Sequence, residues 1–238
     1  MTLPAMKLLA FETATEACSV AVWIDGEVIE RFEIAPRRHA ELALPWADAV
    51  LAEAGIAKSA IDAIAVGRGP GAFTGVRLAI AVAQGVALAL DRPIVPVSTL
   101  AALALQGGAP RVLAAIDARM GEVYAAAFRC DNGDAVLRDA ERVVAPDRVV
   151  LPDDADDWVG VGTGFGAVDG ALSSTLGARF TRIDAAALPH AADVARLAAQ
   201  AFARGEAVAA ELVEPAYLRN NVALTIEEQR ALRQSRGS

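Results

Sequence analysis

The segment that decides the fold runs from Lys7 to Ile34 and reads KLLAFETATEACSVAVWIDGEVIERFEI. It holds three short runs of apolar or alternating residues, at 7–12, 18–24 and 28–34. Turn-forming residues separate the runs, and the second break is Asp25-Gly26, a dipeptide typical of two-residue hairpin turns. The pattern therefore predicts three consecutive antiparallel strands at the start of the chain.

The residues after this segment predict alternating helices and strands. In chain order they are a helix over 39–54, a strand over 61–66, a helix over 74–90, a strand over 93–97 and a short helix beyond. Pro45 lies inside the first helix and predicts a short or kinked first turn. Thr74 and Ser98 are suited to cap the second and third helices.

The second half of the chain repeats this order in outline. Strands are predicted at 111–117, 122–129, 136–143 and 158–162, and helices near 165–176 and 191–204. Two successive β-β-β-α-β-α units are the arrangement of the duplicated actin-like (ribonuclease H-like) α/β fold. We therefore predict this fold, with one subdomain over 1–106, a second over 107–222 and a flexible tail over 223–238.

Composition limits the partners that the chain can hold by itself. The 238 residues are 55% hydrophobic, which is enough for real cores, and 30 acidic against 22 basic residues give a net charge of −8. Binding of nucleic acid normally depends on basic patches that neutralise phosphates. We therefore expect any nucleic acid to be held mainly by another protein.

The cysteines and the apolar segments predict a cytoplasmic protein with no membrane span. Cys18 and Cys130 are isolated, which is typical of reduced thiols. The longest apolar stretch, Leu78–Leu90, contains Gln84 and is shorter than the roughly 18 residues that a span needs. The first residues lack the pattern of a signal peptide.

The glycine-rich segment GRGPGAFTGVR, at 67–77, permits two interpretations. Exposed amides at the start of the following helix could hold an anion, or the glycines could serve only a tight turn between strand and helix. The lysine of a Walker A loop is absent. Together with the hydroxyls between the first two strands, Thr13, Thr15, Gly69 and Gly71 are the candidates for a vestigial phosphate site.

The sequence predicts neither a catalytic residue nor a metal site. His39 and His190 are the two histidines of the chain, and position 43 is Ala, so no HxxxH pair is present. The same scarcity removes most arrangements in which histidine activates a nucleophile. At the end of the first strand stands Glu12, where relatives with a catalytic site usually carry Asp.

The helix predicted over 74–90 is apolar on nearly all sides, with Arg77 and Gln84 as its polar residues. Such a helix must be covered on all sides. Two kinds of cover are open, namely the sheet and neighbouring helices of the same chain, or a partner protein.

Four segments together resemble the bacterial TsaB family over 7–222. They are 14–20 within FETATEACSVAVW, 67–77, AAIDARMGEVY at 114–124 and EPAYLRNN at 214–221. TsaB proteins belong to the same branch as the catalytic subunit TsaD and were formerly labelled glycoprotease homologues. TsaD-like proteins carry an HxxxH metal pair, whereas this chain has His39 with Ala43.

The resemblance implies a subunit without catalytic function, and with ATP and metal bound by its partners. A TsaC-type enzyme makes threonylcarbamoyl-adenylate, and TsaD, with TsaB and TsaE, transfers the threonylcarbamoyl group to tRNA. The acceptor is the adenosine 3′ of the anticodon in tRNAs that read codons beginning with A. The alternatives are a glycoprotease-like metallopeptidase or a stand-alone actin-like ATPase.

The partners that the resemblance implies are TsaD in a heterodimer, TsaE in a larger complex and tRNA held mainly through them. A homodimer is expected when TsaD is absent. In the family the first two helices contact TsaD, and we assign to that surface Leu42, Trp46, Val50, Val76, Arg77 and Ile80. A charge at Leu42 or Ile80 is expected to abolish binding without unfolding the chain, and Trp46 is equally well explained as a core residue.

Overall fold

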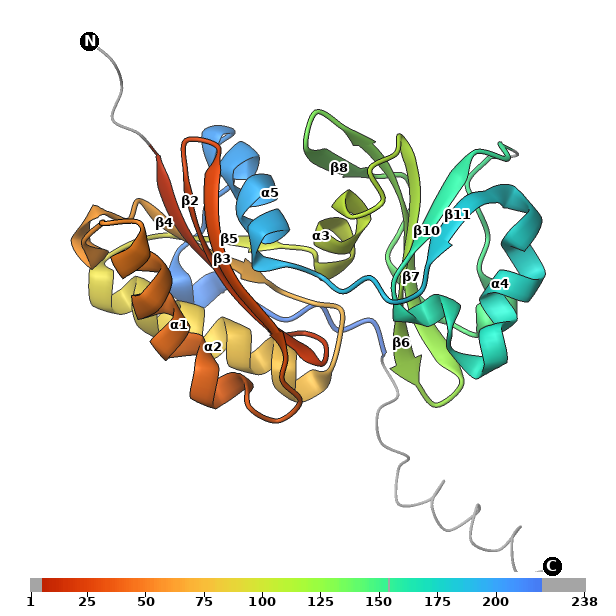
Figure 1. The fold of residues 1–238 in the computed structure, drawn as a ribbon, viewed down its shortest axis with the longest axis horizontal. Coiled ribbons are helices and arrows are strands. Elements are labelled where there is room, and N and C mark those ends of the chain that lie inside the picture. Colours follow the sequence, from red (N-terminus) through yellow and green to blue (C-terminus); the bar gives the residue numbers. More distant parts are fainter. Residues whose placement is uncertain (1–5, 154, 220–238) are drawn as a thin grey trace, which may run out of the picture.

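The computed structural model describes residues 6–153 and 155–219 and contains two sheets, each at the centre of a lobe (Figure 1). The first sheet has the order β3-β2-β1-β4-β5. Its strands are β1 (Lys7–Glu12), β2 (Ala17–Ile24), β3 (Glu27–Ile34), β4 (Ala63–Gly67) and β5 (Ile94–Val97). The first three strands are antiparallel, and β4 and β5 run parallel to β1.

The second sheet repeats the strand order of the first. Its path is β8-β7-β6-β10-β11, with β9 paired to β7. The strands are β6 (Arg111–Arg119), β7 (Glu122–Asp131), β8 (Asp134–Leu137), β9 (Arg142–Val144), β10 (Trp158–Val161) and β11 (Phe180–Asp184). This repetition confirms the predicted duplicated actin-like α/β fold.

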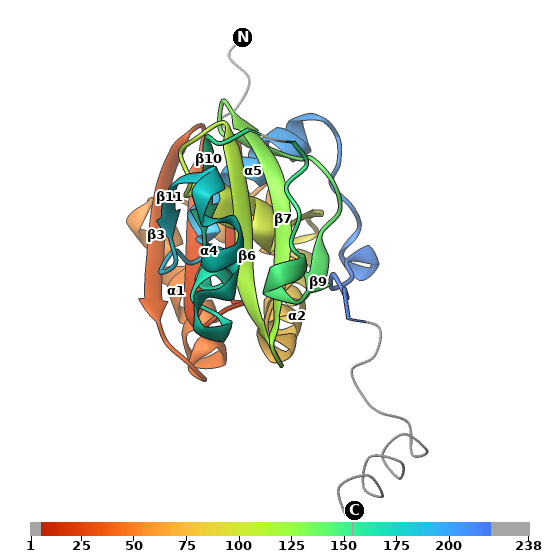
Figure 2. The same cartoon turned by 90° about the vertical axis from the view of Figure 1, so that its right-hand side faces the viewer.

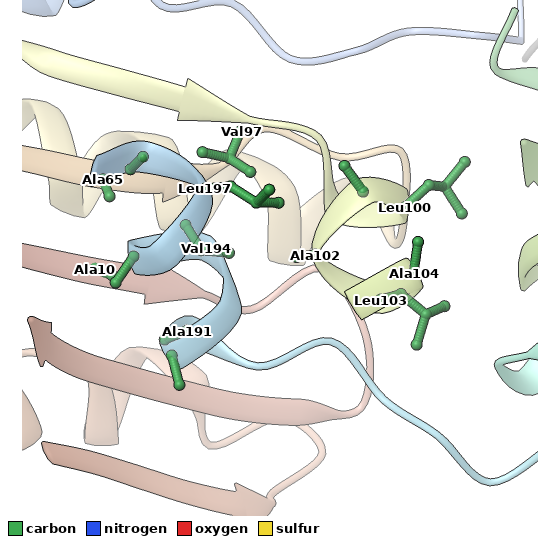
Figure 3. Packing of buried hydrophobic residues seen from close by; sticks show 14 of the residues in the cluster. Ala10, Ala65, Val97, Leu100, Ala102, Leu103, Ala104, Ala191, Val194 and Leu197 are labelled. Carbon is green, nitrogen blue, oxygen red and sulfur yellow. The ribbon is translucent and has the colours of Figure 1, made fainter. Parts of the chain in front are cut away.

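The last helix of each unit packs against the sheet of the other unit. Helix α3 (Thr99–Leu105) follows β5 but contacts β6, β7 and β8, whereas α5 (Ala191–Ala203) follows β11 but contacts β1, β2 and β4. Both helices lie between the two sheets, and their apolar side chains form one continuous cluster (Figure 3). The chain thus crosses to the second sheet after α3, and residues 191–213 return to the first lobe.

Strand β1 is buried on both faces, which explains its uninterrupted apolar run. Side chains alternate between the faces of a strand, so Leu8 and Ala10 point toward α5 while Leu9 and Phe11 point toward the outer helices. Helices α1 (His39–Glu53) and α2 (Phe73–Leu90) cover that outer face (Figure 1). On the inner face, Ala10 and Ala65 leave room for α5 to approach closely (Figure 3).

Three local predictions change in the structure. Helix α2 begins at Phe73 after Ala72, which has no side-chain cap, so the prediction that Thr74 caps it is wrong. Helix α1 continues through Pro45. The predicted strand over 136–143 is divided into β8 and β9, because the chain leaves β7 after Leu137 and returns to it at Arg142.

Other elements are confirmed or extended. Ser98 caps α3, since its hydroxyl accepts a hydrogen bond from the amide of Ala101 at 3.1 Å. The helix predicted over 165–176 is shorter in the structure: α4 covers only Ala171–Leu176, and 3₁₀ turns precede it. The sequence patterns did not predict β11. In the view of Figure 2, the second lobe faces the reader. The predicted tail, 223–238, lies outside the described residues.

Candidate functional site

A cavity of about 700 Å³ lies between the lobes. Its walls come from the β1–β2 turn, the residues before α1, the start of α2, the end of β6 and the chain segment 215–219. Pockets that hold small molecules in proteins typically have volumes of about 300–1,000 Å³. The cavity therefore has the size of a small-molecule site, and its chemistry depends on which groups reach it.

Of the two candidate threonines, Thr15 reaches the cavity wall and Thr13 does not. Thr13 is fully buried, and its hydroxyl donates to the carbonyl of Gly75 at 2.7 Å. The hydroxyl of Thr15 accepts a weak bond from the amide of Ala17 at 3.3 Å. The β1–β2 turn thus uses both hydroxyls to fix its own position and that of α2.

The glycine-rich loop brings the start of α2 against the β1–β2 turn. A Cβ atom at Gly75 would lie 2.0 Å from the carbonyl oxygen of Thr13, and one at Gly71 would lie 2.4 Å from that of Ala14. Because atoms cannot approach so closely, both positions require glycine. The amide of Ala72 donates to the carbonyl of Ala14 at 2.7 Å.

Gly71 lines the cavity, whereas Gly69 is held away from it by Thr99. The amide of Gly69 donates to the Thr99 hydroxyl at 3.2 Å, and its carbonyl accepts from the Thr99 amide at 2.9 Å. Its φ of +90° is one that glycine adopts without strain. Of the four phosphate-site candidates, the structure brings Thr15 and Gly71 to the cavity and places Thr13 and Gly69 in internal hydrogen bonds.

Glu12 points into the protein and is 1% exposed. Its carboxylate accepts hydrogen bonds from the amide of Ala14 at 2.7 Å and from the hydroxyl of Thr99 at 2.9 Å. Burial raises the pKa of Glu12 from 4.5 to about 7, against the opposing effect of these bonds. The carboxylate thus connects β1 to α3 and is not a group of the cavity wall.

The charged residues of the cavity come from both lobes. Asp117, at the end of β6, accepts a bond from Arg119 at 2.8 Å and lies opposite Glu16 and Arg37 of the first lobe. Arg219 reaches the β6–β7 hairpin, where it pairs with Glu122 at 2.5 Å. Acidic and basic groups are therefore both present at the cavity, and neither sign dominates it.

The segment 215–219 joins α2 to the second lobe, a role that sequence reasoning missed. Nε of Arg77 donates to the hydroxyl of Tyr217 at 2.7 Å, and the guanidinium lies 3.7 Å from the ring centroid of Phe73. Two residues later Arg219 also bonds the carbonyl of Ala118 at 3.3 Å. The available signal was the segment EPAYLRNN itself, in which an aromatic and a basic residue, Tyr217 and Arg219, stand two positions apart.

Ser19, Glu30 and His190 form a second polar cluster that was also not predicted. The Ser19 hydroxyl donates to Glu30 at 2.7 Å, and Nδ1 of His190 lies 2.9 Å from the other carboxylate oxygen. Because the hydroxyl bonds the carboxylate and not the imidazole, His190 is not placed to act as its base. The amides of Ala191 and Ala192 bond Ser19 and Glu30, so the cluster caps α5.

The hydrogen bonds of this cluster control the pKa values of its acid and its base. Burial opposes ionisation of Glu30, but the bonds from His190, Ser19 and the Ala192 amide hold its pKa below 4.5. Burial likewise lowers the pKa of His190, yet the hydrogen bond and charge of Glu30 prevail and raise it above 6.5. An ion pair between β3 and the start of α5 is therefore favoured between the lowered pKa of Glu30 and the raised pKa of His190.

The two histidines lie apart in separate hydrogen bonds. Nε2 of His39 lies 3.0 Å from the carbonyl of Thr15, whereas His190 contacts Glu30. Within 6–153 and 155–219, no three His, Cys, Asp or Glu side chains gather as a group that could hold a metal ion.

The structure places most of the predicted partner residues inside the first lobe. Leu42, Val50, Val76 and Ile80 are buried in the chain's own core. A partner cannot reach buried side chains while the helices stay folded. The burial of these four side chains therefore disagrees with the prediction that they contact a partner. Trp46 is half-buried against the same core and Arg77 is exposed.

The exposed side of α2 is apolar too. Leu88 is 69% exposed, and Gly85 and Ala81 lie on the same side, one and two turns before it respectively. On α1, Leu44 is 51% exposed. Among the described residues, α2 is the one helix that is long and apolar enough to cross a membrane. It reaches 18 residues because it begins at Phe73, before the apolar stretch that starts at Leu78. In the structure its buried side packs on β4 and β1.

The sequence matches proteins of tRNA modification. Residues 32–226 match the family model of TsaD, described as tRNA N6-adenosine threonylcarbamoyltransferase. The chain is 47% identical over 226 residues to tRNA threonylcarbamoyladenosine biosynthesis protein TsaB of Escherichia coli K12, covering 92% of this chain and 96% of that protein. It is 39% identical over 229 residues to the TsaB protein of Haemophilus influenzae, covering 91% and 95%.

Two solved structures from Pseudomonas aeruginosa share both lobes. One is a crystal structure of an uncharacterized protein with similarity to peptidase YEAZ, with a TM-score of 0.84 and 50% identity. The other is YeaZ, with a TM-score of 0.82 and 49% identity. Each covers 90% of this chain and is itself matched over 100% of its length.

Proposed function

The chain belongs to the TsaB family, and from this premise we propose that it is a non-catalytic subunit of a threonylcarbamoyl transferase. The assembly acts on the adenosine 3′ of the anticodon in tRNAs that read codons beginning with A. The observation that carries the proposal is the 47% identity to a TsaB protein over nearly the full length of both chains. Relatives with that name act in tRNA threonylcarbamoyladenosine biosynthesis.

The internal use of the phosphate-loop region supports a subunit that does not catalyse the transfer. Glu12, Thr13 and Gly69 are engaged inside the fold, and the amide of Ala72 bonds the β1–β2 turn. These groups would have to give up buried hydrogen bonds before they could hold a nucleotide. ATP and metal are accordingly assigned to the partner subunits.

The contact with a TsaD protein is assigned to the exposed sides of α1 and α2. Leu44 and Leu88 are large apolar side chains in solvent, and α2 adds small residues that let another helix approach. The buried residues Val50 and Ile80 support this surface from below. In the absence of TsaD, a second copy of the chain covers the same surface.

Charge and family membership indicate the remaining partners. A chain of net charge −8 is unlike proteins that hold RNA by themselves, so tRNA is assigned mainly to the partner subunits. Membership in the TsaB family supports TsaE as a further subunit of the larger complex. The proposed tRNA substrate supports a protein that acts in the cytoplasm.

The test is co-purification with the TsaD protein of the same organism. Leu88→Glu should abolish co-purification and tRNA modification, because it places a charge in an apolar contact, while the thermal unfolding curve stays unchanged. Val150→Glu is the matched control, since Val150 is 80% exposed and lies in the other lobe. Normal binding by Leu88→Glu would refute the surface, and robust tRNA-stimulated ATP hydrolysis by the isolated chain would refute the non-catalytic role.

A further inference from the structure

A second hollow, the arginine pocket, lies on the outer face of the second sheet. It has a volume of about 170 Å³, and Arg111, Arg129, Arg138, Trp158 and Asp153 are among its lining residues. The volume is several times the roughly 30 Å³ that one water molecule occupies in the liquid. Its lining residues all belong to the second lobe, whereas α1 and α2 belong to the first (Figure 1).

The strand register brings the three arginines together. Arg111 on β6 lies directly opposite Arg129 on β7. The amide of Arg138 bonds the carbonyl of Ala127, two residues before Arg129 on the same strand. Because side chains two apart share a face of a strand, Arg138 stands on the same face as Arg129.

One edge of the pocket is apolar. Phe128 and Trp158 are among its lining residues, and both are buried. The indole N–H of Trp158, at the start of β10, donates to Asp153 at 3.3 Å. The arginine side chains of β6 and β7 thus lie beside a fixed aromatic side chain.

The arginines are not all neutralised by their neighbours. Arg111 pairs with Asp157 at 2.6 Å and more distantly with Asp153 at 3.8 Å. Over 6–153 and 155–219, neither Arg129 nor Arg138 makes a side-chain hydrogen bond or an ion pair. Like charges directly opposite each other on neighbouring strands repel, so an anion in the pocket would remove an unfavourable interaction.

We propose that the arginine pocket binds a phosphate group. The guanidinium of arginine presents a fork of N–H donors that matches the oxygens of phosphate, and Arg129 and Arg138 have these donors free. Arg111, which Asp157 holds in place, supplies a third positive charge. The carboxylate of Asp153 is occupied by Trp158 and Arg111. The phosphate belongs either to a small phosphorylated compound or to an RNA backbone, and the site does not depend on the proposed function.

The experiment compares three forms of the full chain at low ionic strength. They are the wild type, a pocket variant with Arg129→Gln and Arg138→Gln, and a control with Arg31→Gln and Arg38→Gln. The control makes the same change of charge on exposed residues of the first lobe. Inorganic phosphate and an unmodified tRNA transcript are titrated separately into each protein. Binding is measured by calorimetry and from the NMR signals of the arginine side chains. If the pocket variant does not fold, Arg138→Gln alone replaces it.

The pocket variant should bind about tenfold or more weakly than the wild type, and the control should bind as tightly as the wild type. Loss confined to inorganic phosphate identifies a small compound as the ligand. Loss of tRNA affinity, with a salt dependence reduced by about 0.7–0.9 per phosphate contact, identifies an RNA backbone. The proposal is overturned if neither ligand binds the wild type, if the pocket variant binds both as tightly, or if the control loses as much.

Discussion

Replacing Glu12 by Gln should remove a large part of the pH dependence of folding stability. The carboxyl group has a pKa of about 7 in the folded protein, against 4.5 when it is not buried. A pKa raised by folding means that the native state holds the proton more tightly than the unfolded state. The stability that this contributes is complete below pH 4.5 and is lost as pH rises to about 7.

The magnitude follows from the pKa difference. The two values differ by about 2.5, and at about 1.36 kcal/mol per pKa unit the full loss is roughly 3 kcal/mol. Most of this loss, about 2–3 kcal/mol, falls between pH 5 and pH 8. Glutamine resembles the protonated acid, because its amide can accept from Ala14 and donate to the hydroxyl of Thr99.

The assay is urea unfolding of the wild type and Glu12→Gln at pH 5 and pH 8. We expect similar stabilities at pH 5 and a variant more stable than the wild type by about 2 kcal/mol at pH 8. Other titrating groups, including His190, change both proteins equally and cancel in the difference. Parallel pH profiles for the two proteins would show that Glu12 does not titrate in this range, and the argument from its burial would fail.

Three further results are expected. Gly75→Ala should lower stability by about 1–3 kcal/mol or more in urea unfolding, because its methyl group would overlap backbone, whereas Gly85→Ala, with open space around it, should not. A loss of stability in Gly75→Ala no larger than that in Gly85→Ala would contradict the close approach. NMR titration of His190 should give a pKa above 6.5, and this pKa should fall in Glu30→Gln. The stability that the raised pKa of His190 contributes is present below pH 6.5 and is lost as pH rises through the folded value. An unchanged pKa in Glu30→Gln would argue against the pair. Ile80→Glu should unfold the chain in circular dichroism, and a folded variant would show that Ile80 is accessible.

Local sequence signals predicted most of the regular structure. Alternation in the first 34 residues and the Asp25-Gly26 turn produced three strands where they were expected, because hairpin strands pair with their sequence neighbours. The segments that failed were short. Strand β11 and the division of 136–143 into two strands depend on pairing with distant strands, which periodicity within a few residues does not contain.

The candidate site was predicted only in part. The glycine-rich loop and the β1–β2 turn do meet, and Thr15 and Gly71 line the cavity. Sequence spacing could not show that Thr13 faces Gly75, since the contact joins positions 62 residues apart. For the same reason it missed the cluster of Ser19 with the start of α5, where the sequence separation is 172 residues.

What the sequence by itself determined is the family and the duplicated fold, since both depend on the order of elements and on short motifs. Only the tertiary structure decided which side of each apolar helix meets solvent. Helix α2 is apolar on nearly all sides, so its periodicity does not distinguish buried Ile80 from exposed Leu88. That distinction arises because the first sheet covers one side of the helix, and the sheet takes its place only when β1 pairs with β4 across more than 50 residues of chain.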